Sequence, residues 1–234
     1  MSTILPGNQE SAALALDGGM YGLLARRQGM MAVEPPPDYI QDGLVFHLDG
    51  ADATASQWVD RVGNIAFALT NTTLDGNGGV VFNGSAYGNY PYTLDFPSST
   101  HTIEVVLNKT ETFGGLQVAF MINVSDKVAF GFGSDGKFIV TKSGNSNSRA
   151  TWYTDSGLAT YSVTNSNAYK DCAHMPRRSS DTWFLRTGGT FVGSRSADNA
   201  FFKGTIYQIR IYNRALTQQE IIYNQTIDMQ RYNI

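Results

Sequence analysis

The chain has 234 residues, a length typical of one large domain or of one domain with an appendage; only 16% of the residues are charged, 12% are aromatic and 24 are glycine. A formal net charge of -3, with no basic run longer than the pairs Arg26-Arg27 and Arg177-Arg178, excludes a cationic surface for nucleic acid. One cysteine excludes an internal disulfide or a thiolate zinc site, and the absence of an apolar run of roughly 20 residues predicts no membrane partner.

The first part of the chain differs in composition from the rest. Three prolines, Pro35 to Pro37, favour an extended spacer that neither a helix nor a central strand contains. We interpret 1–38 as a docking arm and linker and 39–234 as the domain, and we expect 42–234 to fold without the arm; the alternative is an arm that wraps its own domain. The residues predicted to anchor the arm are Leu14, Leu16, Leu23, Leu24, Arg26 and Arg27.

The N-terminus also bears on where the protein acts. It lacks the basic and apolar regions of a secretory signal. We therefore expect synthesis in a cytoplasm and, if the protein works outside the cell, release by a signal-free route such as a virion.

From Asp42 onward the apolar residues repeat with a period of two, which sends alternate side chains to opposite faces of a sheet. Leu44, Phe46 and Leu48 are expected to share one face. Ten or so short strands, separated by Gly- and Asn-rich turns, predict two antiparallel sheets packed face to face. The strand candidates are 43–49, 80–82, 101–108, 116–122, 128–132, 137–140, 159–163, 183–186, 190–193 and 203–212.

One helix is predicted, at the end of the chain. Thr217 precedes Glu220 by three residues, the spacing of a capping box, and Leu216 and Ile221 occupy the positions of a hydrophobic staple. The helix is therefore expected to begin at Gln218 and to seal one end of the sandwich.

Several of these stretches resemble a known family. Phe201-Phe-Lys-Gly-Thr-Ile-Tyr-Gln-Ile-Arg-Ile-Tyr-Asn-Arg-Ala-Leu-Thr-Gln-Gln-Glu-Ile221 is similar to the closing signature of the concanavalin A-like lectin/glucanase superfamily, in its LamG-like branch. Gly43-Leu-Val-Phe-His-Leu-Asp49 with Trp58-Val-Asp60 resembles the opening strand and loop, and Val81-Phe-Asn-Gly-Ser-Ala-Tyr87 the second strand. The resemblance covers about residues 42–228, and the region 140–180 departs from it.

The resemblance implies an all-β jelly-roll sandwich with a short C-terminal helix. It does not imply one activity, because LamG-like modules include lectins, adhesion domains, enzymes and structural pieces. A hydrolase of this superfamily places a carboxylate pair along one strand, usually as Glu-x-Asp-x-(x)-Glu. That motif is absent here, and Glu104, the one glutamate inside a predicted strand, is expected to face solvent. A catalytic Glu104 opposite an unidentified aspartate is the alternative.

Metal and cofactor chemistry has little support in the sequence. His47, His101 and His174 lack the spacing of a metal site or of a catalytic triad. Asp49, Asp52 and Asp60 with Asn64 lie in one loop where oxygen ligands can converge on calcium, but solvated turn residues and a buried corner aspartate explain the same pattern. We therefore predict no cofactor and name no metal.

Sugar recognition needs aromatic faces for the apolar side of a pyranose and polar groups for its hydroxyls. Two polar, aromatic stretches, interpreted as loops, supply both. The candidate glycan site comprises Asn145, Asn147, Arg149, Trp152, Tyr153, Tyr87 and Tyr90, with Asn89, Tyr92, Asp155, Tyr161 and Asn165 in the same stretches. The alternative is ordinary loop packing or a subunit interface.

The leading hypothesis is a non-enzymatic virion-surface protein of a bacteriophage, such as a head fibre, decoration or tail adsorption component, whose jelly roll binds host-surface glycans. It predicts a homo-oligomer, with other virion proteins as partners of 1–38. A glycoside hydrolase or lyase acting on a cell-surface polysaccharide is the second hypothesis. A structural piece that makes homotypic contacts and binds no ligand is the third.

Overall fold

The compact unit of the chain runs from Asp38 to Ile234. The computed structural model describes residues 38–94, 100–111, 115–123, 128–142, 149–152, 157–175, 188–196 and 200–234. The six residues predicted to anchor the arm, Leu14 to Arg27, lie outside the described residues, as does the strand candidate 183–186.

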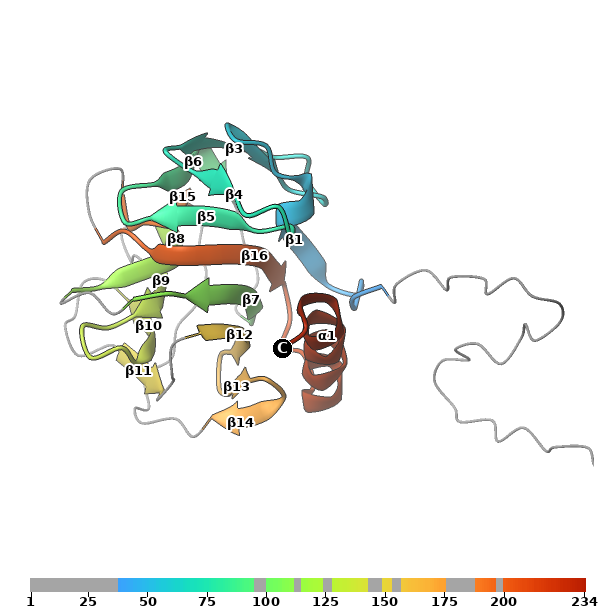
Figure 1. The fold of residues 1–234 in the computed structure, drawn as a ribbon. Coiled ribbons are helices and arrows are strands. Elements are labelled where there is room, and N and C mark those ends of the chain that lie inside the picture. Colours follow the sequence, from blue (N-terminus) through green and yellow to red (C-terminus); the bar gives the residue numbers. More distant parts are fainter. Residues whose placement is uncertain are drawn as a thin grey trace, which may run out of the picture. The chain divides into compact units, whose positions relative to one another are not determined.

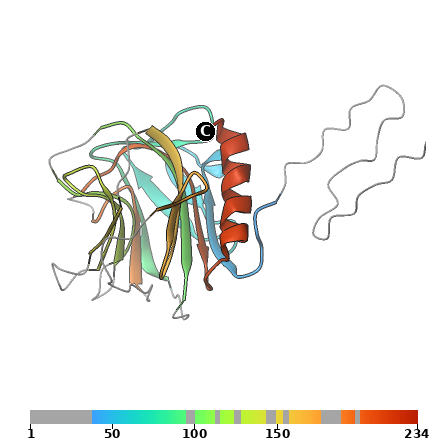
Figure 2. The same ribbon diagram turned by 90° about the horizontal axis from the view of Figure 1, so that it is seen from below.

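The described residues form two antiparallel sheets that face each other, which confirms the predicted jelly-roll sandwich (Figures 1 and 2). Sheet A has the order β14-β13-β12-β7-β16-β5-β4, and β1 also pairs with β16. Its strands are β1 (Leu44–Asp49), β4 (Thr73–Leu74), β5 (Val80–Asn83), β7 (Thr102–Lys109), β12 (Gly157–Thr164), β13 (Ala168–Lys170), β14 (Ala173–Met175) and β16 (Lys203–Tyr212).

Sheet B has the order β11-β10-β9-β8-β15-β6-β3-β2. Its strands are β2 (Gln57–Val59), β3 (Ala66–Thr70), β6 (Tyr87–Leu94), β8 (Gln117–Asn123), β9 (Val128–Phe132), β10 (Phe138–Lys142), β11 (Arg149–Trp152) and β15 (Gly188–Val192). A short 3-10 helix, η1 (Gly50–Asp52), follows β1.

The core lies between the two sheets and is rich in aromatic rings. Phe138 and Tyr161 stack with ring centroids 4.6 Å apart, and Phe132 meets both edge-on. Because Tyr161 is buried there, it is a core residue and lies away from any sugar-binding surface, contrary to its place in the predicted aromatic stretch.

The period-two pattern is interrupted at the start of β1, and the pairing is also irregular within β8 and β16. Phe46 and Leu48 point into the core as predicted, whereas Leu44 packs in a second apolar cluster outside it. The register between β1 and β16 shifts between Leu44 and Phe46, so one extra residue of β1 opposes β16. A β-bulge of this kind moves the preceding side chain to the other face, so the prediction that Leu44 shares the face of Phe46 is wrong.

The helix α1 (Gln218–Tyr232) begins where the sequence predicts. Thr217 accepts a hydrogen bond from the Glu220 backbone, and the Glu220 side chain accepts one from the Thr217 backbone, so the capping box is formed. Leu216 and Ile221 are buried in one apolar cluster, as expected of a staple. The position of the helix differs from the prediction: α1 lies along the outer face of sheet A instead of sealing an end of the sandwich (Figure 2).

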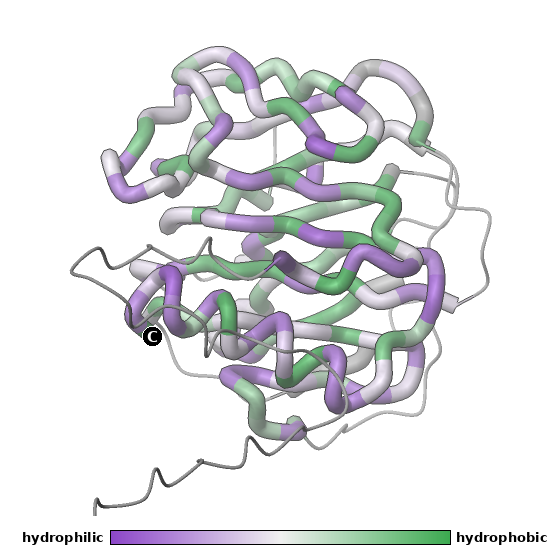
Figure 3. Tube along the Cα trace, turned by 90° about the vertical axis from the view of Figure 1, so that its right-hand side faces the viewer, coloured by the Kyte–Doolittle hydropathy of each residue, from purple (hydrophilic) through white to green (hydrophobic). Residues whose placement is uncertain are grey.

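The face of sheet A that α1 covers is polar. Hydrophilic and hydrophobic residues alternate along the strands of this sheet (Figure 3). Because successive side chains of a strand point to opposite faces, the hydrophobic ones pack in the core and the hydrophilic ones lie on the outer face. Within the described residues no helix is both long and apolar enough to cross a membrane.

Candidate functional site

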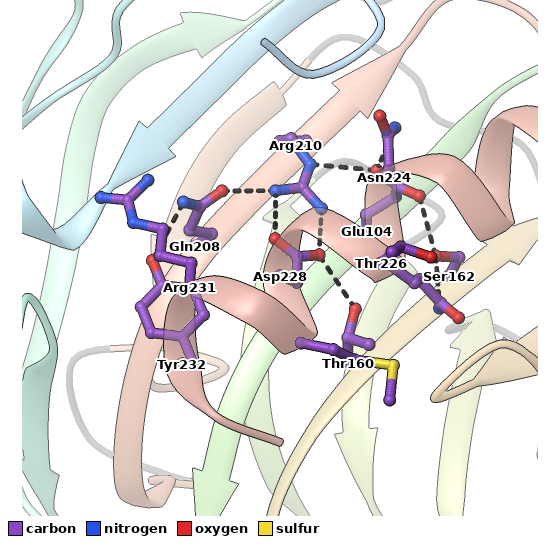
Figure 4. A network of polar contacts seen from close by, with 12 residues as sticks. Glu104, Thr160, Ser162, Gln208, Arg210, Asn224, Thr226, Asp228, Arg231 and Tyr232 are labelled. Atoms are coloured by element: carbon purple, nitrogen blue, oxygen red, sulfur yellow. Dashed lines mark hydrogen bonds and ion pairs between the residues drawn. The ribbon is translucent and has the colours of Figure 1, made fainter. Parts of the chain in front are cut away.

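Glu104 is fully buried under α1, so the prediction that it faces solvent is wrong. Its register places it between Arg210 on β16 and Ser162 on β12. Its carboxylate accepts hydrogen bonds from Arg210 Nε at 3.0 Å, Ser162 Oγ at 2.8 Å and Asn224 Nδ2 at 2.8 Å (Figure 4). The outer face of a sheet would normally be exposed, and here the covering helix buries it.

A second buried carboxylate, that of Asp228 on α1, binds the same arginine as Glu104. Arg210 donates to both oxygens of Asp228 on α1, with distances of 2.9 and 2.5 Å, and also to Gln208. Thr160 Oγ donates to Asp228 at 3.1 Å (Figure 4). We call Glu104, Ser162, Arg210, Asn224 and Asp228 the buried network.

The buried network is built to hold α1 on the sheet. Burial raises the pKa of Glu104, and the nearby Arg210 charge acts in the opposite direction. A glycosidase needs two carboxyl groups that flank a sugar in an open cleft, whereas Glu104 and Asp228 are enclosed and share one guanidinium. The geometry of this pair therefore fits helix attachment and does not fit attack on a polysaccharide.

The aspartates of the β1–β2 loop already have partners. Asp49 binds Arg61 and Arg231, while Asp60 accepts the backbone N–H groups of His47 and Gly63. No group of three or more potential metal ligands from His, Cys, Asp and Glu lies together in the described part of the chain.

Five of the seven residues of the predicted glycan site have no described side chain. Asn145, Asn147 and Tyr153 lie outside the described residues. Arg149 and Trp152 begin and end β11, the edge strand of sheet B, where Trp152 pairs with Phe138.

Tyr87 and Tyr90, the remaining two, lie on strand β6 and not in a loop. The sequence does not predict this strand, because Pro91 has no N–H to donate and because Gly and Asn are poor strand formers. The structure accommodates Pro91 where the pairing of β6 with β15 is irregular, between the pairs Tyr90–Thr190 and Leu94–Gly188.

Strand alternation sends the two tyrosines to opposite faces of sheet B. Tyr87 lies near Phe191 and Phe201, with ring centroids 6.5 and 6.4 Å away. Tyr90 packs against Phe67 of the core at 5.8 Å. The two residues therefore do not belong to one binding surface.

Tyr90 has a different aromatic partner, Tyr92. Their ring centroids are 5.4 Å apart with the planes at 63°. Tyr92 is 70% exposed, more than the other two large hydrophobic residues exposed in the described part of the chain. We call Tyr90 and Tyr92 the tyrosine pair: Phe67 supports Tyr90 from the core, and Tyr90 supports the solvent-exposed ring of Tyr92. The sequence places Tyr92 in the same aromatic stretch as Tyr90, but it does not tell which of the tyrosines is exposed.

The described residues thus define a two-sheet antiparallel β-sandwich with a capped C-terminal helix and an aromatic pair of which one ring is exposed. The chain belongs to the Concanavalin A-like lectin/glucanases superfamily, whose sequence pattern matches residues 74–222, more than half of the chain. No curated protein sequence matches it.

Several solved structures share this fold at low sequence identity. Trypanosoma rangeli sialidase in complex with 2,3-difluorosialic acid has a TM-score of 0.61 at 17% identity, and the match covers 80% of this chain and 33% of the sialidase chain. Domain 4 of AbnA, an extracellular GH43 arabinanase from Geobacillus stearothermophilus in complex with arabinotriose, has a TM-score of 0.57 at 18% identity, covering 78% and 98%. The binding domain of botulinum neurotoxin DC in complex with SialylT has a TM-score of 0.55 at 11% identity, covering 79% and 51%.

Proposed function

We propose that residues 38–234 form a non-enzymatic glycan-binding module and that the tyrosine pair is its stacking platform. The observation that carries this proposal is the 70% exposure of Tyr92 beside a half-buried aromatic partner. An exposed ring that is held from below offers a flat apolar face to a pyranose at little entropic cost.

Two of the similar structures support a binding role over a catalytic one. The arabinanase domain matches along 98% of its own length and was solved in complex with arabinotriose. The neurotoxin match is a binding domain in complex with SialylT. For this chain, the burial of Glu104 supports the same reading, because the one glutamate weighed as catalytic is enclosed beneath α1 and bound to Arg210.

A glycan array with the full chain tests the proposal, followed by titration of the best ligand against two variants. Tyr92→Ala should weaken binding by about fivefold or more, since stacking on an aromatic face contributes on the order of 1 kcal/mol or more. Leu74→Ala is the matched control, because Leu74 is also an exposed apolar residue, at 44%, but lies on sheet A. Equal binding by wild type and Tyr92→Ala would contradict the assignment.

A polysaccharide digest separates this function from the hydrolase or lyase alternative. Candidate cell-surface polysaccharides are incubated with the protein and analysed by mass spectrometry. Intact chains are the expected result. Shortened chains, with a new reducing end or an unsaturated sugar, would instead support an enzyme.

We further propose that residues 1–38 dock this module on a bacteriophage virion as a homo-oligomeric head fibre, decoration or tail adsorption protein made in the host cytoplasm. The apolar residues, the Arg26-Arg27 pair and the three prolines that precede the compact unit support a docking role. Full-length protein and a form lacking residues 1–37 should be added in competition to particles that lack the protein. Only the full-length form is expected to incorporate, and equal incorporation would move attachment to the sandwich.

A further inference from the structure

The segment Asp38–Asp42, which we call the strap, joins the N-terminal part of the chain to β1 and is hydrogen-bonded to α1. The backbone N–H of Ile40 donates to Asn224 Oδ1 at 3.0 Å. Tyr223 Oη donates to the carbonyl of Asp38 at 3.3 Å. Residues some 184 positions apart in the sequence are therefore joined directly.

Tyr39 extends the strap over the buried network. The Cζ atom of Arg210 lies 3.9 Å from the centroid of the Tyr39 ring, and the ring of His47 meets Tyr39 edge-on at 5.6 Å. Tyr39 is only 8% exposed. A guanidinium stacked on an aromatic face in a desolvated site is held more strongly than an exposed one, so the strap helps fix the arginine that binds Asp228 of α1.

The other end of the strap reaches the start of the helix. Arg214 contacts the Asp42 side chain at 2.9 Å and also donates to the Asp42 carbonyl at 3.1 Å. The same guanidinium donates to both carboxylate oxygens of Glu220, at 2.6 and 3.0 Å. Glu220 is half of the capping box, so Arg214 joins the strap to the first turn of α1.

The strap and the helix also share an apolar cluster that is separate from the core of the sandwich. This cluster consists of Tyr169, Tyr212, Leu216 and Ile221, with Ile40 and Leu44 packed against it. The core between the two sheets is a different cluster. Segments that share contacts with each other and few with the main core open together as one cooperative unit.

We infer that the strap and α1 are one cooperative unit, which opens from sheet A as a whole while the sandwich stays folded. Three of the five buried residues of α1, Asn224, Gln225 and Asp228, are polar, and water can replace their partners when the unit opens. Opening therefore costs less than exposure of the main core. Because the strap is the first part of the compact unit, a partner that binds residues before Asp38 is linked to α1 through the hydrogen bonds of the strap.

Hydrogen–deuterium exchange on the full-length chain tests the coupling in both directions. Tyr39→Ala removes the ring over Arg210 and should speed amide exchange along Gln218–Tyr232 by about tenfold, while β8 and β9 keep their protection. Tyr39→Phe is the matched control, since it keeps the ring and should leave exchange unchanged. In the reverse direction, Thr217→Ala weakens the helix cap and should speed exchange at the Ile40 and Leu44 amides by a similar factor.

The outcome at the distant segment decides the inference. Faster exchange in α1 alone after Thr217→Ala, with Ile40 and Leu44 unchanged, would show that the two segments open separately and would overturn the inference. Exchange that accelerates equally in β8 and β9 would mean that the helix opens only with the whole sandwich. Thr217→Ala keeps the test decisive even if Tyr39→Ala does not fold, because Thr217 is exposed and its side chain hydrogen-bonds to Glu220.

Discussion

Asp49 at the end of β1 and Arg231 in the last turn of α1 form a two-pronged ion pair, with Nη1–Oδ2 and Nη2–Oδ1 distances of 2.7 and 2.9 Å. Asp49 is fully buried, and Arg61 also binds its carboxylate, with an Nη1–Oδ2 distance of 2.8 Å. One aspartate therefore fixes both the β1–β2 loop and the C-terminal end of the helix.

This arrangement predicts that Asp49→Ala and Arg231→Ala lower the free energy of unfolding by different amounts. Asp49→Ala should lower the free energy of unfolding by about 3 kcal/mol, because both arginines lose their buried counter-charge. Arg231→Ala should cost no more than about 1 kcal/mol, because Arg231 is partly exposed and Arg61 still neutralises Asp49. Urea denaturation followed by circular dichroism measures both values. Equal losses would show that Arg61 does not compensate.

The helix cap predicts a smaller, local effect. Thr217→Ala should lower the free energy of unfolding by about 1 kcal/mol, because the Glu220 backbone N–H loses its acceptor. Gln219→Ala is the control, since Gln219 is exposed in the same first turn and caps nothing. Thermal melts of the two variants should differ in midpoint but not in spectrum. An unchanged midpoint for Thr217→Ala would mean that packing alone holds α1.

Acid should destabilise the fold through His47. Burial lowers the pKa of His47 from 6.5 to about 4, and the nearby Arg210 charge acts in the same direction. Between these two values the unfolded chain binds the proton and the folded chain does not. His47 therefore contributes its full stabilisation above about pH 6.5 and loses up to about 3 kcal/mol as the pH falls towards 4.

Glu104 opposes this effect in part, because its pKa is raised by burial and the folded state gains the proton first as the pH falls. The measurement is therefore a comparison of slopes. Urea denaturation between pH 7 and 4 should show a steeper loss of stability for wild type than for His47→Gln, whose side chain does not titrate there. Parallel slopes would contradict a depressed histidine pKa.

Local patterns in the sequence predict several strands and the start of the helix correctly. The strand candidates 128–132 and 203–212 match β9 and β16 residue for residue, and the Thr217–Glu220 spacing predicts the start of α1 correctly. Each of these signals depends on neighbours within a few residues, which is why one sequence suffices to find them.

The features that were missed depend on distant pairing. Glu104 alternates correctly in its strand, but its burial follows from a helix that begins more than a hundred residues later. Strand β6 carries Pro91, a residue that argues against a strand until a partner with irregular register is known. Tyr92, the exposed tyrosine of the candidate site, lies on this same strand. Its exposure depends on the irregular pairing and therefore cannot be predicted from the local pattern.

The strap gives a prediction about where the folded unit begins. A fragment of residues 38–234 should melt cooperatively with the stability of the full chain, because it retains Tyr39 and Ile40. A fragment of residues 42–234 should keep its sandwich but lose about 2 kcal/mol, since Arg210 loses its aromatic cover and Asn224 loses the Ile40 N–H. Urea denaturation of both fragments beside the full chain measures the difference. Equal midpoints for the two fragments would show that the strap rests on the helix without stabilising it, and precipitation of 38–234 would show that residues 1–37 complete the fold.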